Sequence, residues 1–479
     1  MTLSDNAQPL WTLSEVREVL GDEIHGAPPA GFTGVSFDSR EIHGGEIFVA
    51  IKGVRMDGHA FAARALRQGA GLSVVRAPDE EMKAAGPLLV VEDTLKALEA
   101  LGRAARARTG AHVIGVTGSV GKTTTKEMLA AALSALGPTH AAKGSFNNHW
   151  GVPYTLANLP RGAAFGVFEL GMNAPGEIAQ LTDMVRPEVA IVTHVAESHI
   201  GAFDGLAGIA RAKAEIFSGL AEGGAAIINA DAPHADILRA AAEEAGAGRV
   251  FMVGAGEKAD VRLRKFVVDA ERGATVVDAD IAGTPVSFLV GLPGEHMARN
   301  ALIVLAVARA LELDMVPLMQ QLREMRPLPG RGRRHVLRLP AGGEILLIDE
   351  SYNANPASVR AALEVLGAVR PGGRGRRVAI LGDMLELGAR GAALHAGLAE
   401  ALEKARVDVL CTAGELMHHL WQAAPAEMRG PRADGWEELL DAVRPALRSG
   451  DVVLVKGSHG SRMHKLVEGL IEAFPPRED

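Results

Sequence analysis

The feature that most constrains the fold is an apolar strand that runs directly into a glycine-rich turn and then a helix. Residues 112–117 form the predicted strand, Gly118 and Gly121 lie in the turn, and a helix is predicted over residues 122–136. Glycine adopts backbone conformations that other residues avoid, so the N–H groups of such a turn can point inward together. The helix that follows adds the positive end of its dipole. The stretch therefore predicts an α/β domain with an anion-binding loop at the end of one strand.

The residues that follow the turn make this prediction more specific. Lys122 can reach the terminal phosphates of a nucleotide, and Thr123 carries a hydroxyl where Mg²⁺ sits in such loops. The spacing is not the common one, because Val116 stands where the first glycine is required and Gly115 lies one step earlier. A plain turn between a strand and a helix is the alternative, but Gly-Lys-Thr directly after a buried strand favours nucleotide binding. The loop is compatible with ATP and with GTP.

Apolar runs of strand length alternate with amphipathic stretches through most of the chain. This alternation is typical of βαβ units around parallel sheets, where ligands gather at the carboxyl ends of the strands. The predicted strands are residues 112–117, 165–169, 189–193, 225–229, 344–349, 378–381, 407–411 and 452–456. The fold class is therefore α/β.

The chain has 479 residues, more than a single domain of about 250–300 residues holds. A Gly/Arg-rich stretch at residues 102–110 and a Pro/Gly-rich stretch at residues 326–334 interrupt the regular pattern. They predict three domains, over residues 1–105, 106–328 and 329–479. The arginines of residues 326–334 are interpreted as a solvated hinge or a phosphate contact.

The composition excludes several classes of protein. Lys and Arg number 50 against 58 for Asp and Glu, and the net charge of −8 argues against a nucleic-acid binder. A single cysteine excludes an internal disulfide framework and any Cys-rich metal site. No signal peptide is recognisable, and the longest strongly apolar run, residues 301–308, is far shorter than the ~20 residues that span a bilayer. A cytoplasmic monomer without membrane insertion is expected.

Three further residues carry chemistry that their spacing leaves open. Glu169 ends a predicted strand, where a carboxylate is either an oxygen ligand for Mg²⁺ or a solvated strand end. His199 is either a ligand or a hydrogen-bonded loop histidine, and spacing alone favours the second interpretation. Lys213 has the pattern of a solvent-facing lysine on a helix.

Taken together, these motifs resemble those of the Mur ligases, the ATP-dependent amide-forming enzymes of peptidoglycan precursor synthesis, across nearly the whole chain. The resemblance implies that Thr123 and Glu169 hold one Mg²⁺ and that His199 and Lys213 hold a second. It also implies that Lys213 is carbamylated, so that an amine becomes an anionic oxygen ligand, and that Lys122, Lys213 and His199 are catalytic. The loop residues expected to bind ATP are Gly118, Ser119, Val120, Gly121, Lys122, Thr123 and Thr124.

Within the family, the resemblance is strongest to the members that join D-alanyl-D-alanine to UDP-N-acetylmuramoyl-tripeptide. The stretches that carry it are residues 37–40, 146–153, 349–356 and 381–388. The substrate-binding residues that it implies are Ser39, Arg40, Asn147, Asn148, Tyr352, Asn353, Lys456 and Ser458. His149 and Trp150 depart from the family pattern, since an acidic–aliphatic pair is more usual there, which affects the substrate-side loop.

Three residues outside the phosphate loop would also contact ATP. Asn300 matches the residue that binds adenine, and an amide can pair with both the amino group and a ring nitrogen of that base. Arg331 and Asp349 match residues of the last domain that close on the phosphate and ribose.

The resemblance implies a small α/β uridine-nucleotide-binding domain, a central ATPase-like parallel-sheet domain and a C-terminal Rossmann-like domain. It further implies that ATP activates the tripeptide's terminal carboxylate as an acyl phosphate, which the dipeptide amine attacks to give a UDP-N-acetylmuramoyl-pentapeptide, ADP and phosphate. Three alternatives are a folylpolyglutamate synthetase-like ligase, a Mur ligase that acts earlier and a non-catalytic nucleotide-binding protein. Residues 38–40, residues 351–356 and the set of magnesium ligands argue against them in turn.

Overall fold

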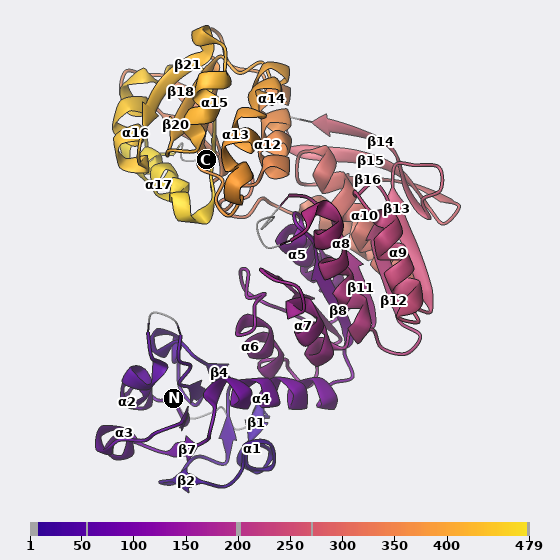
Figure 1. Cartoon of the computed structure of the whole chain (residues 1–479), viewed down its shortest axis with the longest axis vertical. Coiled ribbons are helices and arrows are strands. Elements are labelled where there is room, and N and C mark those ends of the chain that lie inside the picture. The colour runs from indigo at the N-terminus through magenta and orange to yellow at the C-terminus, as the bar shows by residue number, and fades with distance from the viewer. Residues whose placement is uncertain (1–7, 54–55, 198–202, 270–271, 477–479) are drawn as a thin grey trace.

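The computed structural model describes residues 8–53, 56–197, 203–269 and 272–476. Over these residues the strands form three large sheets, which follow one another along the chain, and one short pair. Figure 1 shows the three sheets with their helices as three successive bodies from the N-terminus to the C-terminus. The α/β prediction is confirmed, and each predicted domain contains one large sheet. The domain boundaries themselves stay predictions.

The first sheet has five strands in the order β2-β7-β6-β5-β4. Their bounds are β2 Ile24–His25, β4 Val35–Ser36, β5 Ile47–Val49, β6 Leu72–Val75 and β7 Leu88–Val90, and β1 (Trp11–Thr12) pairs with β3 (Gly31–Phe32) beside them. The helices are α1 Leu13–Leu20, α2 Ala62–Arg67, α3 Glu80–Ala85 and α4 Thr94–Arg108. Helix α4 begins at an N-cap, because the Asp93 carboxylate accepts from the N–H groups of Leu95 and Lys96. It leads into the central sheet.

The central sheet has nine strands in the order β16-β15-β14-β13-β12-β11-β8-β10-β9. Their bounds are β8 His112–Thr117, β9 Thr139–Ala141, β10 Phe165–Glu169, β11 Val189–Val192, β12 Ala225–Asn229, β13 Arg249–Gly254, β14 Val261–Asp269, β15 Ala274–Ile281 and β16 Thr284–Val290. The helices are α5 Lys122–Leu133, α6 Gly151–Ala157, α7 Glu177–Val185, α8 Gly205–Ala214, α9 Ala235–Glu244, α10 Glu295–Ala310 and α11 Met315–Glu324. The apolar run at residues 301–308 lies in α10, where every one of its side chains is buried against the sheet.

The third sheet has six strands in the order β17-β18-β22-β19-β20-β21. Their bounds are β17 Arg333–Arg338, β18 Glu344–Glu350, β19 Arg377–Gly382, β20 Val409–Ala413, β21 Arg429–Ala433 and β22 Val452–Lys456. The helices are α12 Pro356–Ala368, α13 Gly391–Ala396, α14 Ala399–Lys404, α15 Met417–Ala423, α16 Trp436–Val443 and α17 Met463–Ala473. Helix α12 begins with a capping box, in which Asn355 and Ser358 bond each other's backbone N–H.

All eight predicted strands are present, with ends that shift by up to two residues. The central sheet is not wholly parallel, since β15 and β16 pair antiparallel at one edge. This hairpin was not predicted from the sequence, because its strands are half exposed and lack a continuous apolar run. Helix α5 ends at Leu133 rather than Leu136, where the backbone tightens into i−3 hydrogen bonds ahead of Gly137. No helix of the described residues is long and apolar enough to cross a membrane.

Candidate active site

A cavity of about 900 Å³ lies where the carboxyl ends of the central strands face the C-terminal domain. Its walls come from the loop after β8, the ends of β10 and β11, the first turns of α10 and the loops after β18 and β22. Fourteen of the predicted site residues line it, namely Ser119, Val120, Gly121, Lys122, Thr123, Thr124, Asn147, Asn148, Glu169, Asn300, Arg331, Tyr352, Asn353 and Lys456. The topology thus brings together residues that are more than 300 positions apart in the sequence.

The glycine-rich loop is held against β11 by close packing and hydrogen bonds. Gly118 has φ +152°, and a Cβ there would lie 1.9 Å from the Thr193 hydroxyl oxygen. That hydroxyl donates to the Val120 carbonyl at 2.6 Å, and the Ser119 N–H donates to the His194 carbonyl at 2.7 Å. The loop is therefore fixed from one side while its other side faces the cavity.

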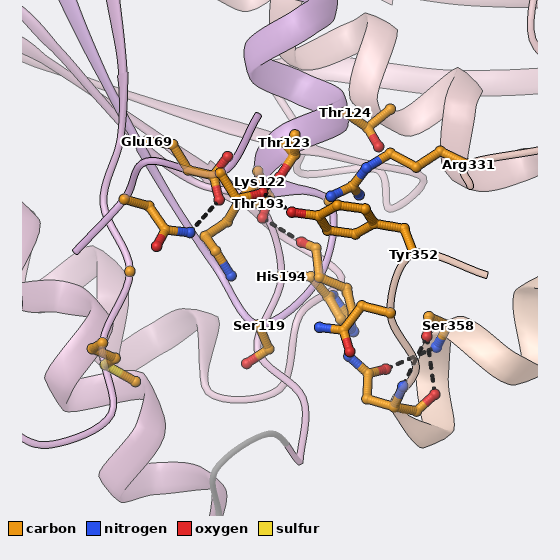
Figure 2. A pocket seen from close by; sticks show the side chains of 18 of the residues that line it. Ser119, Lys122, Thr123, Thr124, Glu169, Thr193, His194, Arg331, Tyr352 and Ser358 are labelled. Carbon is orange, nitrogen blue, oxygen red and sulfur yellow. Dashed lines mark hydrogen bonds between the residues drawn. The ribbon is translucent and has the colours of Figure 1, made fainter. Parts of the chain in front are cut away.

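Lys122 lies at the first position of α5 and folds back over the loop. Its ammonium donates to the Gly118 carbonyl at 2.7 Å. Burial lowers the pKa of Lys122, and the Glu169 carboxylate acts in the opposite direction. Figure 2 shows Lys122, Thr123 and Glu169 gathered at one end of the cavity. An anion placed there would meet a cation, a hydroxyl and the N-terminus of a helix together.

Glu169 has the environment of a metal ligand. Its side chain is 1% exposed, and one carboxylate oxygen accepts from the Asn147 amide at 2.7 Å. The other oxygen, Oε2, is buried and has no hydrogen-bond partner within the described part of the chain. A buried anionic oxygen left unsatisfied is costly unless a cation completes it. These residues fit Mg²⁺, with Thr123 supplying a neutral oxygen; no group of three or more His, Cys, Asp or Glu side chains suited to a metal occurs among the described residues.

Lys213 is not the solvent-facing lysine that its spacing indicates. It lies near the end of α8, it is 3% exposed, and no carboxylate or other hydrogen-bond partner meets its ammonium among the residues described. Burial lowers its pKa well below the ordinary 10.5, and the nearby positive charge of Lys122 adds to this effect. The side chain is therefore disposed to be a neutral amine.

The predicted ligand His199 lies outside the described residues.

Two residues of the C-terminal domain lie across the cavity, close to the phosphate loop. The Arg331 guanidinium lies over the Tyr352 ring at 4.0 Å, a cation–π arrangement. The Tyr352 hydroxyl donates to the Ser145 hydroxyl of the central domain at 2.7 Å. In Figure 2 both side chains point toward Thr123 and Thr124. They bring a positive charge next to the place where a nucleotide's terminal phosphates would lie.

Lys456 is held at the end of β22 by the loop after β18. Its ammonium donates to the Asn353 carbonyl at 2.9 Å and lies 3.3 Å from a Glu350 carboxylate oxygen. Burial lowers the pKa of Lys456, while Glu350 raises it. The side chain is 3% exposed and borders the cavity. It supplies a second cation on the wall opposite the phosphate loop.

Two predicted contact residues are instead engaged in holding loops. Both oxygens of the Asp349 carboxylate are used, one by the Gly330 N–H at 2.7 Å and the other by the Ser351 N–H and hydroxyl. The Ser458 hydroxyl accepts from the Leu385 N–H and donates to the Ala354 carbonyl. Neither residue borders the cavity, so in this arrangement they position its walls.

Asn300 lies on α10, is 8% exposed and faces Gly121 of the loop. Asn148 borders the cavity, but its side-chain oxygen accepts hydrogen bonds from the N–H groups at the start of α6. Ser39 and Arg40 lie outside the cavity, in the first domain, where Arg40 pairs with Asp38 at 2.6 Å. They belong to a separate part of the predicted substrate path.

Several residues at the cavity were not among the predicted site residues. They are Ser145, Thr193, His194, Asn229, His296, Arg299 and Glu350. Ser145 directly precedes one of the stretches that carry the family resemblance and Glu350 lies within another, which is the signal that could have found them. Thr193 and His194 follow β11, Asn229 ends β12, and His296 and Arg299 lie in the first turns of α10. The strand order and the placement of α10 bring them to the cavity, and no local pattern encodes either.

Three protein-family models match successive parts of the chain. The Mur ligase middle domain matches residues 116–308, the Mur ligase glutamate ligase domain matches residues 332–459, and the Mur ligase family catalytic domain matches residues 31–107. The chain belongs to the Mur ligase family. The three matches follow the order of the three sheets.

Curated relatives extend the similarity along almost the whole chain. The UDP-N-acetylmuramoyl-tripeptide–D-alanyl-D-alanine ligase of Escherichia coli is 35% identical over 473 residues, which covers 96% of this chain and 98% of that protein. The enzyme of the same name from Bacillus subtilis is 32% identical and covers 92% of this chain and 93% of its own.

Solved structures agree in fold and in extent. The crystal structure of MurF from Acinetobacter baumannii has a TM-score of 0.84 and 30% identity, and covers 96% of this chain and 99% of that one. MurF ligase from Thermotoga maritima in complex with ADP has a TM-score of 0.75 and 26% identity, and covers 92% and 97%.

Proposed function

We propose that this chain is an ATP-dependent ligase that joins D-alanyl-D-alanine to UDP-N-acetylmuramoyl-tripeptide, giving a UDP-N-acetylmuramoyl-pentapeptide for peptidoglycan synthesis. The observation that carries the proposal is one cavity that combines the phosphate loop, the unsatisfied Glu169 oxygen and the cations Arg331 and Lys456 of the last domain. The curated relatives, which bear the name of that reaction along nearly their full length, support the choice of substrates.

The first step is phosphorylation of the tripeptide's terminal carboxylate. A carboxylate oxygen attacks the γ-phosphorus of ATP, the bond to the β–γ bridging oxygen breaks, and ADP leaves. Negative charge builds on the transferred group, and Lys122, the loop N–H groups and Arg331 are disposed to stabilise it. Asn300 is proposed to bind adenine.

The second step is attack by the dipeptide amine on the acyl carbon. The amine loses a proton as the C–N bond forms, and inorganic phosphate leaves with the former carboxylate oxygen. Lys456 lies on the C-terminal wall, 3.3 Å from Glu350, so it is placed to hold an anionic end of the dipeptide or the departing phosphate. Closure of the last domain over the cavity would exclude water, which would otherwise hydrolyse the acyl phosphate.

Thr123 and Glu169 are proposed to hold one Mg²⁺, and Lys213 with His199 a second. When bound, these ions neutralise phosphate charge. Carbamylation of Lys213 requires a neutral amine to add to CO2, and burial without an acidic partner favours that form. Lys213→Ala should be inactive and should regain activity with added acetate or another short carboxylate. Full activity of the unsupplemented variant would contradict the carbamate.

The uridine diphosphate end of the substrate is proposed to bind the first domain, at Ser39 and Arg40. Phe37, which precedes them, stacks edge-on against Phe146 at 5.9 Å, and Phe146 adjoins the loop residue Asn147. This contact places the segment before Ser39 and Arg40 next to the loop that borders the cavity, which supports the proposal. The residues 326–334 are proposed as the hinge on which the last domain closes.

The proposal is tested by phosphate release from ATP with purified protein, Mg²⁺ and UDP-N-acetylmuramoyl-tripeptide, with and without D-alanyl-D-alanine. Release that needs both substrates, together with the pentapeptide product, is expected. Release with a UDP-muramoyl-dipeptide and a diamino acid instead would move the enzyme one step earlier in the pathway. No release with any muramoyl substrate would contradict the proposal and leave a folate-directed ligase or a non-catalytic nucleotide binder.

A further inference from the structure

A chain of three hydroxyl groups crosses from the C-terminal domain to the phosphate loop. The Tyr352 hydroxyl donates to the Ser145 oxygen at 2.7 Å, and the Ser145 oxygen lies 3.3 Å from the hydroxyl oxygen of Thr123. Tyr352 follows β18 in the last domain, whereas Ser145 and Thr123 belong to the central domain. Ser145 is thus the only residue of the three that touches both of the others.

The loop that carries Ser145 is held in place by hydrogen bonds from helix α5. Lys126 is fully buried one turn into α5, and its ammonium donates to the carbonyls of Ala142 and Gly144. It also pairs with Glu127 at 2.7 Å. Charge-assisted bonds to two carbonyls of one loop are strong, so the backbone on the N-terminal side of Ser145 is fixed. The Ser145 hydroxyl therefore meets Thr123 from a defined position.

We propose that Ser145 is a positioning residue, through which Tyr352 of the docked C-terminal domain orients the Thr123 hydroxyl toward the Mg²⁺ of the bound nucleotide. The inference rests on the proposed function for the role of Thr123 as a ligand. Whichever oxygen donates in the Ser145–Thr123 contact, Thr123 keeps a lone pair for a cation. Docking of the last domain then adds one hydrogen bond to this chain, so domain position and metal binding are coupled.

The expected consequence appears in nucleotide binding as well as in turnover. Ser145→Ala should weaken binding of ADP about tenfold in the presence of Mg²⁺ and leave binding in EDTA unchanged, since partners that orient a ligand are typically worth about 10–100-fold in metal affinity. The measurement is a titration with a fluorescent ADP analogue under both conditions. Ser145→Thr retains the hydroxyl and should restore the Mg²⁺-dependent part.

A double-variant cycle separates the hydroxyl chain from simple loss of packing. Tyr352→Phe removes the hydroxyl but keeps the ring under Arg331, and it should lower Mg²⁺-dependent affinity as Ser145→Ala does. If the chain acts as one unit, the double variant is no weaker than Ser145→Ala alone. Ser134→Ala, at an exposed serine after α5, is the matched control and should bind as wild type.

Additive effects, or equal losses with and without Mg²⁺, would overturn the proposal. If Ser145→Ala does not fold, Tyr352→Phe alone tests the proposal, through the ratio of its ADP affinities with Mg²⁺ and with EDTA. This outcome can be separated from that of the proposed function. A protein whose Mg²⁺-dependent affinity for ADP depends on the hydroxyl chain, but which ligates no muramoyl substrate, would refute the proposed reaction and support the role of Ser145. An active ligase in which Ser145→Ala leaves the ratio of ADP affinities with and without Mg²⁺ unchanged would support the reaction and refute the role of Ser145.

Discussion

At the scale of single residues, burial decides roles that the sequence leaves open. Lys213 has the spacing of a surface lysine, yet it is 3% exposed, because that side of α8 faces the interior of the central domain. Spacing along one helix does not reveal which neighbours will cover it, so the family resemblance alone pointed to its role. For Asp349 the motif predicts a nucleotide contact, and in this structure its carboxylate accepts hydrogen bonds from Gly330 and Ser351. The nucleotide contact stays a prediction.

The buried lysine predicts a definite dependence of stability on pH. Burial lowers the pKa of Lys213 in the folded chain below 10.5, so over an interval of pH the unfolded chain binds a proton there that the folded chain has released. The free energy of unfolding therefore decreases as the pH falls through that interval. Lys213→Met should therefore raise the Tm above that of wild type at pH 7, in CO2-free buffer without Mg²⁺, and the difference should shrink toward pH 10. Thermal unfolding across this range measures it.

The control for this prediction is Lys258→Met, at an exposed lysine. Its Tm should follow wild type at every pH. A Lys213→Met difference that stays constant from pH 7 to pH 10 would mean that Lys213 keeps its proton on folding, and would remove the physical basis for a reactive amine.

At the scale of elements, the strands that could be predicted are those buried on both faces, because they read as continuous apolar runs. The short strands of the first sheet, two to four residues each, and the half-exposed hairpin of β15 and β16 lack that signal. The phosphate loop was predicted because glycine, lysine and threonine stand at fixed offsets after β8. Its contact with β11 depends on strand order, which no local pattern encodes.

The conformation of the phosphate loop can be tested by a substitution that adds one methyl group. Gly118→Ala places a Cβ against the Thr193 hydroxyl at a φ of +152°, so both the contact and the backbone oppose it. ATP affinity should fall by at least about a hundredfold, as measured by titration with a fluorescent nucleotide, while circular dichroism stays near wild type. Gly162→Ala adds the same methyl in open space and should bind normally. Unaltered binding by Gly118→Ala would show that the loop tolerates another shape.

At the scale of the whole molecule, the central and C-terminal domains contact each other by more than the hydroxyl chain. Arg390 at the start of α13 pairs with Glu197 of the central domain at 2.5 Å, and the arginine is 57% exposed. Exposed ion pairs contribute up to about 1 kcal/mol and weaken in salt. This pair therefore stabilises the contact between the two domains modestly. Glu197 lies two residues before the predicted ligand His199 in the sequence.

Arg390→Ala should shift the population toward an open arrangement. Small-angle scattering with bound nucleotide should give a larger radius of gyration than wild type at low salt, and the two proteins should converge at 0.5 M NaCl. The reversed pair, Arg390→Glu with Glu197→Arg, should recover the compact form. Identical scattering of Arg390→Ala and wild type at low salt would exclude a part for this ion pair in domain position.

The central claim is that one cavity phosphorylates a carboxylate and then passes its acyl group to an amine. The most direct measurement uses UDP-N-acetylmuramoyl-tripeptide with ¹⁸O in the terminal carboxylate, together with ATP, Mg²⁺ and D-alanyl-D-alanine, and mass spectrometry of the products. With both carboxylate oxygens labelled, we expect one ¹⁸O in each inorganic phosphate released and one retained in the new amide of the pentapeptide. Pentapeptide formed alongside unlabelled phosphate would contradict it.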